Sequence, residues 1–68
     1  EHIASIDSYT EAIRLFPYMG DAYYNRGLVL IYLKDREKGC IDLSRAGELG
    51  VVEAYNVINR YCEQEGDL

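Results

Sequence analysis

The chain has 68 residues, of which 49% are hydrophobic and 28% are charged, and its formal net charge is -5. This length allows one small domain with a thin core, and the composition is typical of a folded chain. Because its basic residues are scattered singly and its longest apolar run, Leu28–Leu33, is far shorter than the roughly 20 residues that span a bilayer, we expect no nucleic-acid partner and no membrane insertion.

The first predicted element is an amphipathic helix within residues 1–17. A proline disfavours the helical conformation of the residue before it, so this helix is expected to end ahead of Pro17. The sequence PYMGD that follows is predicted to be a tight connection. The apolar stripe of the helix is formed by residues three and four positions apart, Ile6, Tyr9, Ile13 and Phe16, and Ala12 lies beside it.

Three further helices are predicted, and no strand. The second spans residues 21–33, and the charged sequence LKDRE separates it from the third, at 36–49. Asp35 is placed to cap the third helix, and Gly50 to end it in the left-handed conformation. The fourth helix, 52–64, carries on one side Tyr55, Ile58 and Cys62.

An internal repeat relates the two halves of the chain. Shifting the sequence by 34 residues aligns Tyr9 with Leu43 and Ala12 with Ala46, and lays AIRLF over AGELG. A second echo, DAYYN against EAYNV, needs a shift of 32 residues. Periods of this size are typical of stacked helical hairpins, each too small to bury its own apolar face.

With this repeat the chain resembles the tetratricopeptide repeat family. The phrases YNRG and ELG are also common in that family and in its Sel1-like relatives. Positions that match the pattern of the family are Tyr9, Ala12, Pro17, Tyr23, Gly27, Leu43 and Ala46. Positions that depart from it are Ser5, Leu30, Gly39 and Val51.

The resemblance implies an all-α fold of about four helices, in which antiparallel hairpins stack as a short right-handed solenoid. Residues 1–17 would be the second helix of a partial repeat, 20–51 one full repeat, and 52–65 a C-terminal capping helix. The alternative all-α arrangement is a generic four-helix bundle. Because the chain begins at Glu1 without a methionine, we expect a piece of a longer protein or a processed one.

Catalytic chemistry is not indicated. The single histidine, His2, stands at the start of the chain, where a terminal surface residue is expected. No nucleophile motif, phosphate loop or metal-ligand spacing is present, so we expect no enzyme, no cofactor and no metal. We interpret as solvated helix faces the carboxylates Asp7, Glu11, Glu37 and Glu48.

The two cysteines are expected to lie in contact. If the third and fourth helices are antiparallel about the turn at Gly50, Cys40 and Cys62 each lie roughly 15 Å from that turn at a rise of about 1.5 Å per residue. A disulfide there would staple the last helix, with a stabilisation on the order of 3 kcal/mol, whereas reduced cysteines would be ordinary packing residues. A bonded pair would indicate an exported protein and a reduced pair a cytoplasmic one.

The family resemblance also implies a function, because the first helix of each repeat lines a groove that binds extended peptides or partner helices. In this chain that helix is 21–33, with Tyr23, Gly27 and Leu30 towards its neighbours. Asn25 matches a position that often holds the backbone of a ligand. The residues expected in the groove are Tyr24, Asn25, Leu28, Ile31 and Tyr32. The alternative is that Leu28, Ile31 and Tyr32 are buried against the first and last helices.

A second hypothesis is self-association. If the first helix has lost part of its cover, its face bearing Tyr9, Ala12 and Phe16 would be an exposed apolar patch. A second copy of the chain, or further repeats of a longer protein, would cover it.

Gly27 interrupts an apolar helix and lowers its stability by about 1 kcal/mol relative to alanine. We expect a close approach of the neighbouring hairpin helix at this position, where any side chain would clash.

Overall fold

The computed structural model describes residues 2–62, and in that range it contains four α-helices and no strand. The all-α class and the order of the helices are therefore confirmed. Their bounds are His2–Leu15 for α1, Gly20–Tyr32 for α2, Arg36–Glu48 for α3 and Glu53–Tyr61 for α4. The last helix is shorter than predicted, and residues 63–65 of that prediction lie outside the described residues. No helix within residues 2–62 is long and apolar enough to cross a bilayer.

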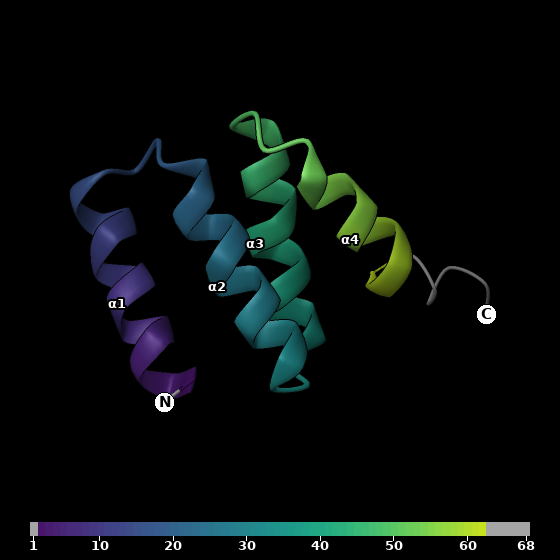
Figure 1. The fold of residues 1–68 in the computed structure, drawn as a ribbon, viewed down its shortest axis with the longest axis horizontal. Coiled ribbons are helices and arrows are strands. Elements are labelled where there is room, and N and C mark those ends of the chain that lie inside the picture. The colour runs from purple at the N-terminus through teal and green to yellow at the C-terminus, as the bar shows by residue number, and fades with distance from the viewer. Residues whose placement is uncertain (1, 63–68) are drawn as a thin grey trace.

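The helices follow one another across the molecule in chain order (Figure 1), from α1 at one end of the long axis to α4 at the other. The extensive contacts join α1 to α2, α2 to α3 and α3 to α4. The molecule measures 38 × 26 × 14 Å, so it is flat. Because packed helices lie about 8–10 Å apart, a thickness of 14 Å cannot surround any helix on all sides.

The core is small and is centred on α3. Leu43 and Ala46 of this helix are fully buried, together with Ala54 of α4. Leu43 is the only large side chain with no exposed surface among the described residues. Partly buried residues of α2, of α4 and of the segments next to α4 pack around this core cluster of Leu43, Ala46 and Ala54: Tyr23, Tyr24, Leu28, Ile31, Val51, Val57, Ile58 and Cys62.

Two glycines allow α2 and α3 to approach each other closely. A Cβ atom on Gly27 would lie 2.8 Å from Leu43 Cγ and 3.0 Å from the carbonyl oxygen of Gly39. A Cβ atom on Gly39 would lie 2.9 Å from the carbonyl oxygen of Gly27. The close approach predicted at Gly27 is therefore confirmed, and the same contact leaves no room for a side chain at position 39.

The predicted caps of α3 are confirmed. The Asp35 side chain accepts a hydrogen bond from the backbone N–H of Lys38, and Gly50 has φ +105° beyond the last turn. The conformation that ends α2 was not predicted. After this helix, Lys34 adopts the left-handed conformation at φ 72°. Backbone hydrogen bonds close this end, from Lys34 N–H to the Ile31 carbonyl and from Asp35 N–H to the Leu30 carbonyl.

Candidate functional site

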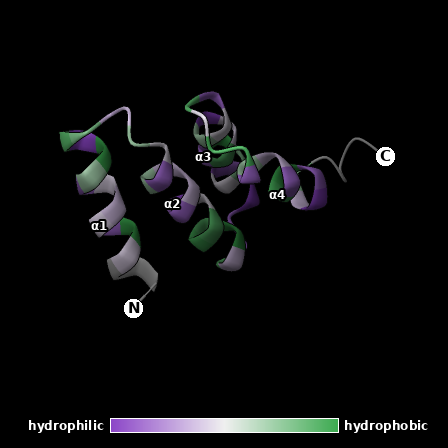
Figure 2. Cartoon of the chain, turned by 45° about the horizontal axis from the view of Figure 1, so that its top comes forward, coloured by the Kyte–Doolittle hydropathy of each residue, from purple (hydrophilic) through white to green (hydrophobic). Residues whose placement is uncertain are grey.

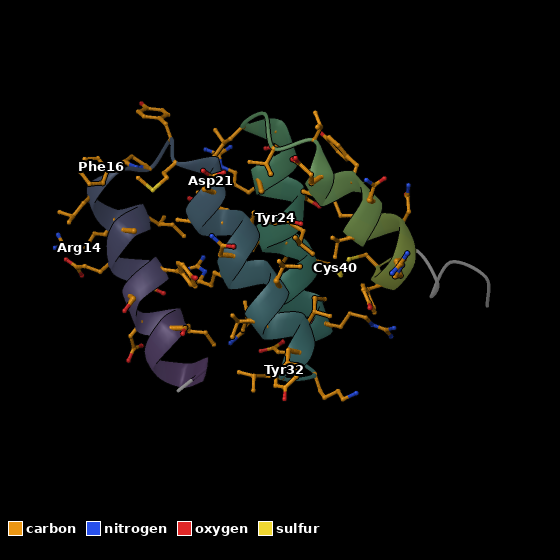
Figure 3. All side chains as sticks on the ribbon, viewed as in Figure 1. Arg14, Phe16, Asp21, Tyr24, Tyr32 and Cys40 are labelled. Atoms are coloured by element: carbon orange, nitrogen blue, oxygen red, sulfur yellow. A yellow bond between two sulfur atoms is a disulfide. The ribbon has the colours of Figure 1, made fainter. Side chains whose placement is uncertain are left out.

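The predicted groove residues of α2 differ in how far they are covered. Tyr24, Leu28 and Ile31 are half-buried and pack against the core cluster. Asn25 is also half-buried, whereas Tyr32 is 67% exposed. In Figure 3, Tyr24 lies midway along α2 and Tyr32 at its C-terminal end, beside the turn to α3. Each of these side chains thus keeps part of its surface accessible.

Residues of α4 border the same core cluster from the other side. Val57 and Ile58 are half-buried against it. The C-terminal half of α2 is markedly hydrophobic (Figure 2). We call five of the half-buried apolar residues that pack against this cluster from the two helices the α2–α4 strip: Tyr24, Leu28, Ile31, Val57 and Ile58.

An open hollow of about 930 Å³ adjoins this strip at Ile31. Its charged residues are two cations and two anions, so the lining has no net charge that would select an ionic ligand. The hollow is lined by the end of α2, the start of α3 and the end of α4, with Ile31, Lys34, Asp35, Arg36, Glu37, Cys40, Tyr61 and Cys62.

The two cysteines meet in the wall of this hollow. Their Sγ atoms lie 2.09 Å apart, at disulfide-bond distance, and tie the middle of α3 to the end of α4. The predicted contact between Cys40 and Cys62 is therefore confirmed. Cys40 lies between α3 and α4 in Figure 3.

A partly buried ion pair joins α2 to α3. Arg26 Nε donates to Asp42 Oδ2 at 2.7 Å, and Arg26 Nη2 donates to Asp42 Oδ1 at 2.9 Å. Arg26 Nη1 also donates to Thr10 Oγ1 of α1 at 3.0 Å, and the guanidinium lies 5.8 Å from the centre of the Tyr23 ring. The hydrogen bonds to Asp42 raise the pKa of Arg26, with partial burial opposing them. Arg26 is therefore engaged within the fold.

Asp42 was not singled out by the sequence analysis. It is only 5% exposed, on a face of α3 whose buried members lie at helical spacing. The available signal was an acidic residue within that stripe, at Gly39, Asp42, Leu43, Ala46 and Gly47. A carboxylate in such a stripe needs a cationic partner, because an unpaired buried charge is strongly unfavourable.

The residues predicted for self-association lie on and just after α1. Tyr9 and Ala12 are half-buried, and Phe16 is 57% exposed. Figure 3 shows Phe16 at the end of α1, well separated from Tyr32 at the end of α2. The sequence analysis missed neighbouring exposed apolar residues, because it read PYMGD only as a turn. We call these residues, together with Phe16, the connection patch: Leu15, Phe16, Tyr18 and Met19.

The acidic residues considered for catalysis lie on exposed surface. Glu11 pairs with Arg14 and Glu48 with Arg45, each three positions apart on an exposed helix face. Asp7 and Glu37 are also exposed. Within residues 2–62, no group of three or more histidine, cysteine, aspartate or glutamate residues could hold a metal ion.

The resemblance to the tetratricopeptide family rests on the repeat and the matching residues described above. Comparison of the chain with protein-family models, with curated proteins and with solved structures gives no match.

Proposed function

We propose that the chain is a non-catalytic protein–protein interaction module of tetratricopeptide-like, stacked-hairpin type. It binds a peptide or a partner helix along α2. The observation that carries this proposal is the α2–α4 strip, because its apolar side chains are only half-buried in a flat molecule. Each further 100 Å² of apolar surface that a partner buries there contributes roughly 2.5 kcal/mol.

The chemistry of the strip sets the class of partner. Tyrosine and aliphatic side chains favour a ligand that inserts apolar anchors, and the hollow beside Ile31 has balanced charges. The half-buried amide of Asn25 can bond both a backbone N–H and a backbone carbonyl of an extended peptide. Arg26 is paired with Asp42, so we do not expect it to bind a carboxylate of the ligand.

Panning a phage-displayed library of random peptides on the immobilised chain tests this binding mode. Peptides rich in apolar residues should be enriched, and Asn25→Ala combined with Tyr32→Ala should weaken their binding at least about tenfold by removing an amide and an aromatic contact. Tyr18→Ala, at an 82% exposed position in the connection before α2, is the control and should leave their affinity unchanged. Failure to enrich any peptide, or equal binding by all three proteins, would contradict the proposal.

Self-association is the second candidate, and the connection patch favours it. Its residue Tyr18 is 82% exposed and Phe16 is 57% exposed, which is unusual for neighbouring large apolar side chains. A second copy of the chain would cover both without using the α2–α4 strip.

Light scattering over a concentration series distinguishes this candidate. We expect a dimer that Phe16→Ser with Tyr18→Ser weakens at least about tenfold, because both changes remove apolar contact area. Tyr24→Ser with Asn25→Ala is the control and should not change the association. A monomer at every concentration would eliminate self-association and leave peptide capture in place.

A further inference from the structure

The last helix is weakly held in the fold. α4 has nine residues, fewer than the about 12–15 that an isolated helix needs in water. Its N-cap residue, Val52, makes no side-chain capping hydrogen bond, and Ala54 is its only fully buried residue. The ring of Tyr55 packs over Gly47 of α3, but Tyr55 remains 48% exposed.

The C-terminal half of α4 depends on the disulfide. Residues 59–61 are exposed, so after Ile58 the next residue that packs against the core cluster is Cys62. Its bond to Cys40 is therefore the main tie between the last turn of α4 and α3.

Both cysteines keep part of their surface accessible to solvent. Cys40 and Cys62 line the open hollow beside Ile31, and both are only half-buried. Lys34 and Arg36 belong to the same lining, so an approaching thiolate meets positive as well as negative charge. A disulfide in such a position can exchange without unfolding of the chain.

We propose that the Cys40–Cys62 disulfide is a thiol–disulfide exchange site for dithiol reductants, and that its reduction releases α4 from α3. The thiolate of the reductant attacks one sulfur of the bond and displaces the other as a thiolate, which takes up a proton. The second thiol of the reductant then resolves the mixed disulfide. The protein gains two electrons and two protons as two free thiols, and the reductant leaves as its own disulfide.

Release of α4 changes the apolar surface of the molecule. Ala54 packs with Leu43 and Ala46, so departure of α4 uncovers those two residues of α3. The α2 half of the strip then becomes continuous with the exposed core. This redox control goes beyond the proposed binding function, because it needs no partner to operate.

Amide hydrogen exchange on the full chain, oxidised and then reduced by dithiothreitol under nitrogen, tests the release. Amides of residues 57–62 should exchange roughly three hundredfold faster after reduction, the factor expected from loss of a crosslink between residues 22 positions apart. Amides in α2 should keep their protection. Equal acceleration in every helix, or no change in α4, would overturn the proposal.

Two controls make the test specific. Cys40→Ser with Cys62→Ser should exchange like the reduced chain and be insensitive to dithiothreitol. The rate of reduction should be independent of urea below the unfolding transition, whereas a steep rise with urea would show that the bond is reached only in the unfolded chain and would refute the exchange site. Neither measurement involves a partner, so these failures would leave the proposed function intact.

Discussion

Asp42→Ala is expected to destabilise the chain by about 3 kcal/mol, measured by urea unfolding followed by circular dichroism. The change leaves the Arg26 guanidinium, whose side chain is 21% exposed, without the carboxylate that accepts two of its hydrogen bonds. Partial exposure allows some hydration of Arg26, so we expect the lower end of the range for a broken buried ion pair. The loss approaches the whole stability expected of a domain of this size.

Two variants distinguish the effect of breaking the Arg26–Asp42 ion pair from the effect of removing an exposed charge. Glu48→Ala removes a carboxylate whose partner, Arg45, is 48% exposed, and should cost less than about 1 kcal/mol. Arg26→Met with Asp42→Leu removes both charges and should be close to neutral, because no unpaired charge remains. A small effect of Asp42→Ala would show that the ion pair does not hold α2 to α3.

The features predicted correctly from sequence are those encoded over short distances. Helix positions follow from apolar spacing, and the ends of α3 follow from Asp35 and Gly50. The contact of Cys40 with Cys62 needed one further assumption, an antiparallel pair of helices about a short turn. Gly27 was informative because its helix propensity is poor, so that a reason for it had to lie in the packing.

The features missed depend on how the helices are oriented relative to one another. The partner of Arg26 is 16 positions away on another helix, and nothing local to either residue specifies the pairing. How much of Tyr24, Leu28 and Ile31 is covered depends on how α2 packs against the core cluster of α3, which apolar periodicity does not determine. From the sequence, Leu28 and Ile31 were expected either in the groove or buried, whereas in the structure their surface is shared between the core and solvent.

The disulfide and the ion pair stabilise different parts of the fold. The contacts of Arg26 bring together Thr10 of α1 and Asp42 of α3, whereas the disulfide fastens α4 alone. Loss of the ion pair should therefore weaken the packing of the first three helices, and reduction should act first at the C-terminal end. This difference permits a change in α4 while α2, with the proposed binding residues, stays in place.

Gly27→Leu is expected to destabilise the chain by about 4 kcal/mol, enough to unfold a domain of this size. Leucine is the better helix former by close to 1 kcal/mol, so propensity alone predicts the opposite sign. The contacts decide the outcome, because even the Cβ atom would lie 3.0 Å from the Gly39 carbonyl oxygen and 2.8 Å from Leu43 Cγ. The backbone oxygen cannot move without separating α2 from α3.

Thermal unfolding followed by circular dichroism measures this effect. Gly27→Ala should fall between wild type and Gly27→Leu, since its single methyl group meets the same two atoms but gains helix propensity. Ser44→Leu is the control, because it places a leucine on an exposed position of α3 and should change stability by less than about 0.5 kcal/mol. A raised melting temperature for Gly27→Leu would show that α2 and α3 do not approach as closely as two facing glycines allow.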